Sequence, residues 1–151
     1  MLEIHNSLTK QKEPFYPIEP NKIRMYVCGL TAYDYTHIGH GRTNASFDVI
    51  VRYLRFSGYD VTYVRNFTDI DDKIIQRAHD NNEPYYELTA RFMQAMHEDM
   101  AALGILPPDD EPLATQYIEQ MQAMIQKLLA NGHAYIGSNG DVYYRVASFA
   151  E

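Results

Sequence analysis

The feature that most constrains the fold is a strand–helix–strand pattern in the first half of the chain. Lys22–Cys28 (KIRMYVC) is short and rich in β-branched and aromatic residues, which is typical of a buried strand. From Gly39 to Ser57 the apolar residues recur at helical spacing, and Gly58 supplies a C-terminal stop. Asp60–Phe67 (DVTYVRNF) has the composition of a second strand. This order predicts a βαβ unit, in which a right-handed helical crossover joins two parallel strands.

Helices and a connector are predicted after this unit. Three acidic residues, Asp69, Asp71 and Asp72, suit the first turn of a helix, where the helix dipole favours negative charge. Pro84 suits the first turn of a second helix, which we expect to end near Leu103. The proline-rich stretch ILPPDDEP cannot be helical, so we interpret it as a connector.

The C-terminal part carries a third predicted helix and a hairpin. From Leu113 to Ala130 the apolar residues follow one helical face. This face consists of Tyr117, Ile118, Met121, Ile125, Leu128 and Leu129. The stretch HAYIGSNGDVYYRV predicts two short strands around a Ser-Asn-Gly-Asp turn. We assign the helical methionines to helix packing; they are Met93, Met96, Met100, Met121 and Met124.

Composition indicates a soluble globular domain. Of the 151 residues, 46% are hydrophobic and 22% are charged, which is enough apolar material for one core. No apolar run approaches the roughly 20 residues needed to span a bilayer, and the N-terminus lacks the apolar region of a signal peptide. The single cysteine excludes an intramolecular disulfide, so we expect a reducing, cytoplasmic location.

The net charge of −7 limits the role that nucleic acid can have as a partner. A self-contained nucleic-acid-binding domain carries a basic face, because contacts to phosphates need lysine and arginine. The 13 basic residues of this chain are scattered along the sequence. Any docking surface for nucleic acid should therefore lie mainly outside the chain, whereas a nucleotide, which needs few donors, is not excluded.

The segment CGLTAYDYTHIGHG joins the first strand to its helix and holds the candidate site. Ligands of parallel α/β sheets bind beyond the carboxyl ends of the strands. Cys28 lies at the expected strand end, while His37 and His40 lie at the helix start, where free backbone N–H groups attract anions. Gly39 and Gly41 let a base or a phosphate approach the backbone closely. This arrangement predicts phosphate-ester chemistry on a nucleotide, with the imidazoles as hydrogen-bond donors.

The tetrapeptide HIGH, His37–His40, is the signature of the class I aminoacyl-tRNA synthetases. The stretches MYVCGLTAYDYTHIGHGR and YLRFSGYDVTYVRNFTDIDDKII resemble the cysteine-specific members of this family, the cysteine–tRNA ligases. The resemblance covers most of the chain and implies a Rossmann-type (HUP-like) parallel sheet. It also implies a monomeric cytoplasmic enzyme that activates L-cysteine with Mg²⁺–ATP to cysteinyl-adenylate and transfers it to tRNA(Cys).

The resemblance further implies roles for individual residues. His37 and His40 are expected to be catalytic and to contact ATP, together with Ile38 and Gly39 between them. Cys28 matches the first ligand of a Zn²⁺ ion that binds the substrate thiolate. This metal makes chemical sense, because an apolar pocket separates cysteine from serine poorly, whereas a zinc–thiolate bond does so directly.

Three further positions match the lining of the family's amino-acid pocket: they are Gly29, Thr31 and Thr68.

Complete family members carry features that this sequence lacks. Their remaining zinc ligands (a Cys, a His and a Glu), their KMSKS loop and their tRNA-binding domains lie further along the chain. The C-terminal hairpin also has no evident partner. We therefore interpret residues 1–151 as the N-terminal half of a catalytic domain, ending before these features. As such it should be inactive alone and should hold no stoichiometric zinc.

Simpler explanations exist for each candidate residue. A lone cysteine is often a small buried hydrophobe, and histidines at a helix start can be caps or solvated side chains. The acids of TDIDD resemble a metal cluster, but a first helical turn explains them more simply. The other histidines show no partner pattern, and we expect them at the surface; they are His5, His79, His97 and His133.

Three alternative functions stay open at this level. A cysteine ligase of mycothiol biosynthesis shares the fold, HIGH and the cysteine, but joins cysteine to an amino sugar. A stand-alone nucleotidyltransferase also carries an HxGH loop, normally nearer the N-terminus and without the cysteine. A non-catalytic remnant would keep the fold only for nucleotide binding.

Overall fold

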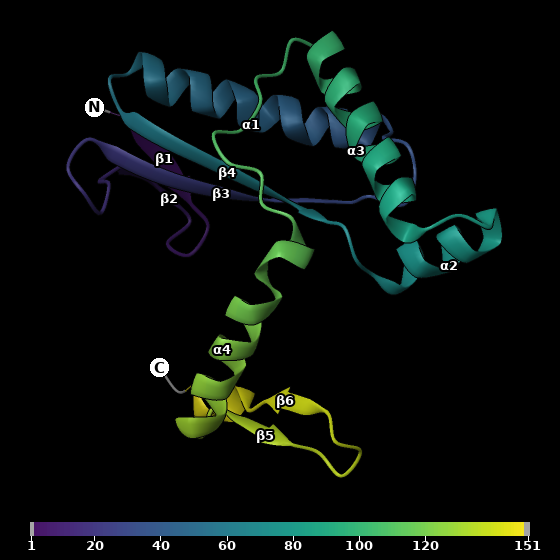
Figure 1. Cartoon of the computed structure of the whole chain (residues 1–151). Helices are drawn as coiled ribbons and strands as arrows, with labels where there is room; N and C mark the ends of the chain where they lie inside the picture. The colour runs from purple at the N-terminus through teal and green to yellow at the C-terminus, as the bar shows by residue number, and fades with distance from the viewer. Residues whose placement is uncertain (1, 150–151) are drawn as a thin grey trace.

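A computed structural model describes residues 2–149 of the protein, and its central feature is the βαβ unit (Figure 1). Strand β3 (Lys22–Thr31) leads through a loop into helix α1 (Ile38–Phe56), and strand β4 (Asp60–Thr68) follows. The two strands are parallel neighbours in one sheet. The predicted strand–helix–strand order and the parallel pairing are therefore confirmed.

Strand β3 runs further than expected and contains an irregularity. The sequence predicts an end at Cys28, but the strand continues for three more residues, and pairing with β4 resumes at Leu30 and Thr31. The register shifts between Val27 and Leu30, so that Cys28 and Gly29 together face the single residue Asn66. Cys28 thus lies inside the strand, because a bulge bends a strand without ending its pairing.

The connector after helix α3 lies along the outer edge of β4. Asp110 bridges to Val64 and Leu113 bridges to Phe67, both in parallel orientation. The amide of Phe67 donates to the carbonyl of Pro112 at 2.9 Å. The proline-rich stretch is non-helical, as predicted, and it also supplies backbone acceptors to the sheet edge.

Helices α2 (Asp72–Asn81) and α3 (Tyr85–Ala102) agree with the predicted helices. Asp71 caps α2, since its side chain accepts a hydrogen bond from the amide of Lys73 at 2.9 Å. Pro84 is the cap residue directly before α3 rather than a member of its first turn. This placement suits proline, which has no N–H to leave unpaired.

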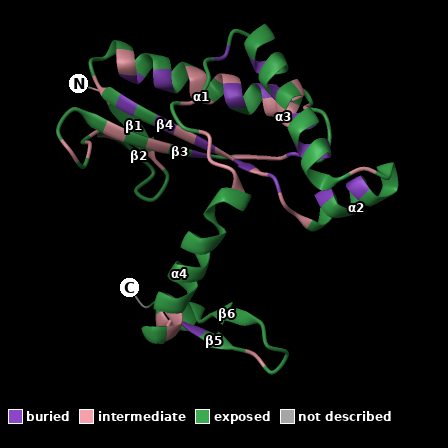
Figure 2. Cartoon of the chain, viewed as in Figure 1, coloured by how far each residue is buried: buried purple, intermediate pink, exposed green. Residues whose placement is uncertain are grey.

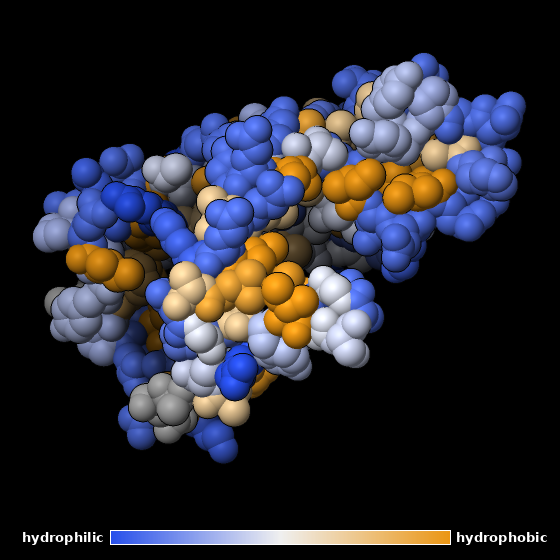
Figure 3. All heavy atoms as spheres, turned by 60° about the horizontal axis from the view of Figure 1, so that its bottom comes forward, coloured by the Kyte–Doolittle hydropathy of each residue, from blue (hydrophilic) through white to orange (hydrophobic). Residues whose placement is uncertain are grey.

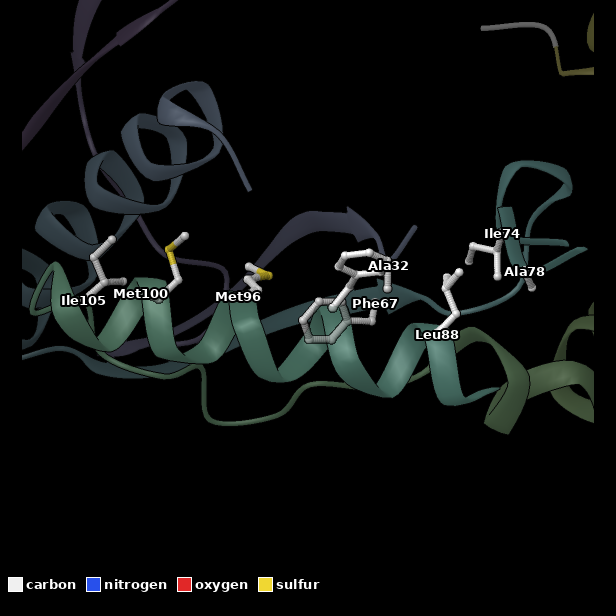
Figure 4. Packing of buried hydrophobic residues seen from close by; sticks show 9 residues of the cluster. Ala32, Phe67, Ile74, Ala78, Leu88, Met96, Met100 and Ile105 are labelled. Atoms are coloured by element: carbon white, nitrogen blue, oxygen red, sulfur yellow. The ribbon is translucent and has the colours of Figure 1, made fainter. Parts of the chain in front are cut away.

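Two hydrophobic clusters form the core. One joins β4 to α2 and α3 (Figure 4) and consists of Ala32, Phe67, Ile74, Ala78, Leu88, Phe92, Met96, Met100 and Ile105. The other lies between α1 and the two strands and consists of Val27, Val51, Leu54, Val61 and Tyr63. Met93 packs half-buried against the first cluster, so the packing role predicted for the α3 methionines is confirmed.

The C-terminal part extends away from this body (Figure 1). It comprises a 3₁₀ turn η1 (Ala114–Tyr117), helix α4 (Ile118–Ala130), the strands β5 (Ala134–Ile136) and β6 (Val142–Tyr144), and a second 3₁₀ turn η2 (Val146–Ser148). The two strands pair antiparallel, which confirms the predicted hairpin. We call residues 114–148 the extension.

Most of the apolar face of α4 is not covered by the described part of the chain, and only Leu128 and Leu129 at its end are half-buried. None of the α4 residues is buried, and Figure 2 shows this helix almost entirely in the colour of exposed residues. Met121 and Met124 are 44% and 65% exposed, so the packing role predicted for these two methionines is wrong. Figure 3, in which this end of the molecule comes forward, shows apolar side chains gathered at the surface.

A short N-terminal hairpin was not predicted from the sequence. Strands β1 (Glu3–Asn6) and β2 (Gln11–Pro14) pair antiparallel. The sequence QKEP of β2 lacks the alternation of apolar and polar residues that indicates a strand. Within residues 2–149, no helix has both the length and the apolar character needed to cross a bilayer.

Candidate functional site

A cavity of about 410 Å³ lies at the carboxyl end of β3, where parallel sheets bind their ligands. The cavity is lined by the end of β3, the loop 32–37 and the start of α1, together with residues of β4, α2 and α3. The lining consists of Gly29, Leu30, Thr31, Ala32, Tyr33, Asp34, Tyr35, Thr36, His37, His40, Phe67, Lys73, Phe92 and Met96.

His37 and His40 form a stacked pair at the start of α1. Their ring centroids are 3.8 Å apart, with 21° between the ring planes. Nδ1 of His37 accepts a hydrogen bond from the amide of Gly39 at 3.1 Å, and Nδ1 of His40 accepts one from the amide of His37 at 3.2 Å. His37 is thus the N-cap of the helix, which confirms the capping alternative without excluding a second role.

These hydrogen bonds determine which ring nitrogen of each histidine carries a proton. A backbone N–H is always a donor, so each Nδ1 must be an acceptor and a neutral ring must hold its proton at Nε2. Burial of the ring, and secondarily the like charge of His37, lower the pKa of His40 from its ordinary value. Near neutral pH, His40 therefore presents a neutral Nε2–H donor.

Gly39 is required by the position of the His37 ring. A Cβ atom on Gly39 would lie 2.8 Å from Cε1 and 3.0 Å from Nδ1 of His37. A larger residue would push the ring off the helix start and break the cap. The glycine of HIGH therefore has a structural reason that does not depend on a ligand.

The loop before the histidines is attached to α2 and α3. The Tyr35 ring contacts Phe92 edge-on at 5.0 Å between centroids, and the Thr36 hydroxyl donates to the Asp99 carboxylate. Asp34 lies 3.9 Å from the Arg77 guanidinium. Because Thr36 directly precedes His37, α3 helps to hold the histidine pair in place.

The bulge in β3 is built around Gly29 and Asn66. The amide of Gly29 and the hydroxyl of Tyr26 both donate to Oδ1 of Asn66, each at 2.8 Å. A Cβ atom on Gly29 would lie 1.5 Å from the Asn66 carbonyl oxygen, so only glycine fits there. Neighbouring Cys28 is a free, exposed cysteine, and the buried-hydrophobe explanation for it is wrong.

The cavity brings together only part of the predicted set of site residues. Its lining includes Gly29, Thr31, His37 and His40, but not Cys28, Ile38, Gly39 or Thr68. The Ile38 side chain is 87% exposed. Thr68 is the pairing partner of Thr31, and its carbonyl accepts a hydrogen bond from the amide of Ala32 at 3.1 Å.

Cys28 offers one potential metal ligand. Among the described residues, no three His, Cys, Asp or Glu side chains are grouped so that they could hold a metal ion. An exposed thiol suits a soft metal such as zinc, which is typically held by four ligands in structural sites and by three protein ligands in catalytic ones. A site with three protein ligands built on Cys28 would therefore need at least one ligand from outside residues 2–149.

The three acids of TDIDD have different roles. Asp71 caps α2 and Asp72 lies in its first turn, as predicted. Asp69 does not belong to this turn: it is buried, and it accepts hydrogen bonds from the amide of Thr115 at 3.0 Å and from its hydroxyl at 2.5 Å. It therefore attaches the extension to the end of β4.

Two of the four remaining histidines have partners that the sequence did not reveal. His97 Nε2 lies 2.6 Å from Glu111, which also binds the buried Arg65 at 2.6 Å. His133 Nδ1 lies 2.9 Å from the Ser148 hydroxyl. The expected surface position is confirmed for His5, His79 and His97, which are exposed, whereas it is wrong for His133, which is half-buried.

Sequence reasoning missed several residues around the cavity. Lys73 contributes the only basic side chain other than histidine to the described lining, and its ammonium lies 5.7 Å from the centre of the Tyr33 ring. In the sequence, the only indication of this role is that Lys73 directly follows the acids of TDIDD. Phe92 and Asn66 gave none, because an aromatic residue in a helix and an asparagine in a strand have no distinctive pattern.

A second, apolar cavity of about 730 Å³ lies away from the histidines. The N-terminal segment, the first half of β3 and helix α1 line it. Its walls include Val49, Ile50 and Tyr53 of α1, which are all at least 44% exposed. It contains no histidine, cysteine or aspartate and is therefore unsuited to the chemistry considered above.

Comparisons with known proteins agree with this picture. Residues 14–151 match the family described as tRNA synthetases class I (C) catalytic domain. The chain is 64% identical over 151 residues to the cysteine–tRNA ligase of Halorhodospira halophila, covering all of this chain and 33% of that protein. It is 63% identical over 150 residues to that of Dichelobacter nodosus, covering 99% of this chain and 33% of that protein. The chain thus spans about a third of the length of these curated relatives.

Solved structures support the Rossmann-type fold. The methionyl-tRNA synthetase of Mycobacterium tuberculosis in complex with methionyl-adenylate matches with a TM-score of 0.61 and 25% identity, over 74% of this chain and 23% of that chain. A leucyl-tRNA synthetase (LeuRS) of Agrobacterium radiobacter in a ternary complex with tRNA matches with a TM-score of 0.65 and 21% identity, over 80% of this chain and 16% of that chain. The HIGH tetrapeptide lies at the start of α1, between the parallel strands β3 and β4. Together with the family match over residues 14–151, this shows that the chain belongs to the family of class I (C) tRNA synthetase catalytic domains.

Proposed function

We propose that this chain is the N-terminal part of a catalytic domain that activates cysteine with Mg²⁺–ATP and transfers it to tRNA(Cys). The observation that carries this proposal is the stacked pair of His37 and His40, which lines a cavity at the carboxyl end of β3 with both Nδ1 atoms occupied. The identity to cysteine–tRNA ligases supports cysteine as the amino acid and tRNA, rather than an amino sugar, as its acceptor.

The two histidines act as hydrogen-bond donors to the α-phosphate of ATP. Negative charge grows on the α-phosphate oxygens as the cysteine carboxylate attacks and pyrophosphate leaves, and preorganised donors stabilise that charge most in the transition state. The backbone hydrogen bonds hold both rings before ATP arrives, so little reorganisation is needed. Gly39 lies next to the His37 ring, where a flat adenine could approach the backbone.

The amino-acid pocket lies along the bulged end of β3. Gly29 and Thr31 line the cavity directly, and Thr68 lies beside Thr31 on β4. Cys28 provides one thiolate ligand for zinc, with further ligands from the remainder of the polypeptide. When bound, zinc supplies a soft Lewis acid that prefers the thiolate of cysteine to the hydroxyl of serine. A single thiolate competes with its own proton for the metal, so the 151-residue chain alone should retain no stoichiometric zinc.

Contacts to tRNA are assigned mainly to regions outside this chain. The net charge of −7 leaves too few basic side chains for an extensive phosphate-binding surface. Magnesium accompanies ATP as its counterion. We assign the whole enzyme to the cytoplasm and to a monomeric state on the basis of the family resemblance alone.

The test uses the full-length parent enzyme, meaning the enzyme of which this chain is proposed to be the N-terminal part. The measurement is cysteine-dependent exchange of pyrophosphate into ATP. His37→Ala and His40→Ala should each lose about 2–4 kcal/mol of transition-state stabilisation, because each removes one preorganised donor. The apparent KM for cysteine should change much less. His79→Ala is the matched control, since this histidine side chain is 85% exposed on α2.

Exchange rates within threefold of the parent in both site variants would remove the histidines from the mechanism. An unmodified parent that exchanges pyrophosphate with another amino acid, and not with cysteine, would refute the assigned substrate.

A further inference from the structure

The bulge in β3 changes which side chains share a face of the strand. From Val61 on β4 to Asp69 directly after the strand, the residues alternate regularly, with every second one buried. On β3, Val27 is buried, and regular alternation would next bury Gly29 and then Thr31. Instead, Leu30 packs against the core and Ala32 is buried, so the alternation is shifted by one residue after Val27.

The consequence concerns the proposed amino-acid pocket. An unbulged strand would place Thr31 on the core face, opposite to Cys28, because side chains alternate with a period of two. With the bulge, Thr31 alternates with Leu30 and Ala32, which face the core, so Thr31 and the exposed Cys28 both face away from the core. The bulge is therefore the device that brings these two residues to one side of the strand.

The side chain of Asn66 completes the bulge. At a bulge, two residues of one strand face a single residue of the other, so an amide of the bulged strand loses its regular hydrogen-bond partner in the sheet. Here the Gly29 amide donates to the side-chain Oδ1 of Asn66 at 2.8 Å, and the Tyr26 hydroxyl donates to the same oxygen at 2.8 Å. Since the Gly29 amide can only donate, the oxygen of the Asn66 amide group must point toward β3.

We propose that Asn66 is the positioning residue of the cysteine pocket: its Oδ1 holds the Cys28–Gly29 bulge, and thereby the placement of Cys28 relative to Thr31. Asn66 need not touch the substrate for this role. The link to cysteine selection rests on the function proposed above, whereas the link to the bulge rests on geometry alone.

The first measurement is independent of catalysis. Hydrogen exchange of individual backbone amides is followed in the full-length parent, in Asn66→Ala and in Asn66→Asp. The Gly29 amide should exchange about tenfold faster in Asn66→Ala, because it loses its acceptor, while Asn66→Asp retains an oxygen and should stay within threefold of the parent. The Arg65 amide, bound to the Asp110 carbonyl at 3.1 Å, is the internal control and should not change.

The second measurement separates positioning from general destabilisation. In cysteine-dependent pyrophosphate exchange, Asn66→Ala should raise the apparent KM for cysteine about tenfold and leave the KM for ATP within threefold. Asn66→Asp should restore the cysteine KM to within threefold of the parent. Asn81→Ala, which removes an exposed side chain bonded to Glu83, is the matched control and should change neither KM.

The proposal is overturned if the Gly29 and Arg65 amides accelerate equally in Asn66→Ala, since that result indicates global loosening. It is also overturned if both KM values rise together, or if Asn66→Asp is as impaired as Asn66→Ala. If the unmodified parent shows no cysteine-dependent exchange, the proposed function fails, and the hydrogen-exchange result still decides the role of Asn66 in the bulge.

Discussion

The end of strand β3 and helix α4 contrast in how their side chains are covered. Around the bulge, polar groups have defined partners inside the fold, since Asn66 accepts two hydrogen bonds. Beyond the bulge, the chain contributes a buried core residue again at Ala32. Along α4, by contrast, no residue is buried, and apolar side chains such as Ile118 and Ile125 are at least 40% exposed. The polar groups of the first region are satisfied within the fold, whereas the second region presents an apolar face that the described residues leave mostly uncovered.

This difference indicates where rigidity resides in the chain. Burying apolar surface contributes roughly 25 cal/mol per Å², so α4 contributes little to the stability of the body. The extension is attached to the body through specific contacts such as Asp69 with Thr115. The candidate site therefore depends on β3, β4 and the helices packed on them, and little on the extension.

The largest expected effect comes from closing the space at the bulge. Gly29→Ala should reduce the free energy of unfolding by about 4 kcal/mol or more, because its Cβ would lie 1.5 Å from the Asn66 carbonyl oxygen and the backbone must move. Urea denaturation followed by circular dichroism measures this loss.

Gly140→Ala is the matched control in the extension. Gly140 has φ +87°, but a Cβ atom there would meet no heavy atom within 4 Å, so only backbone strain of about 1 kcal/mol is expected. Equal losses in the two variants would contradict the contrast between a closely packed bulge and an open extension.

A smaller effect is expected from shortening one methionine in each region. Met96→Ala removes a side chain that is 2% exposed and should cost about 2–3 kcal/mol, in the lower part of the range of about 2–5 kcal/mol for a buried methionine. Met124→Ala removes one that is 65% exposed and should cost less than about 0.5 kcal/mol. The same denaturation experiment compares them. A loss of about 2 kcal/mol or more in Met124→Ala, as for a buried side chain, would mean that the α4 face is covered in solution.

Much of the fold follows from local sequence pattern. The composition of Lys22–Cys28, the helical periodicity before Gly58 and the Ser-Asn-Gly-Asp turn each specify an element without help from distant residues, and all three elements are present. The HIGH tetrapeptide likewise located the helix start and the cavity. These features are predictable because backbone conformation and apolar spacing act over a few residues.

The rest depends on partners that are distant in sequence. Asp69 resembled a helix-start residue, yet Thr115, 46 positions away, determines its role. The bulge requires Gly29 and Asn66 to meet across two strands, 37 positions apart. The α4 periodicity correctly predicted a helix but did not reveal whether another surface covers its apolar face. A single sequence does not show which residues will become neighbours.

The smallest expected effect concerns proton binding at the candidate site. Burial and the like charge of His37 lower the pKa of His40 below its ordinary value of 6.5, so between the two pKa values the unfolded chain binds more protons than the folded one. Stability contributed by neutral His40 is therefore fully present above about pH 6.5 and is lost as the pH falls toward the lowered pKa.

In His37→Ala the pKa of His40 should rise but stay below 6.5, because the like charge is gone while the burial remains. Titration of the His40 ring protons by NMR measures both values. An unchanged pKa in the variant would show that the stacked rings do not interact electrostatically, and would leave burial as the only cause that keeps the donor neutral.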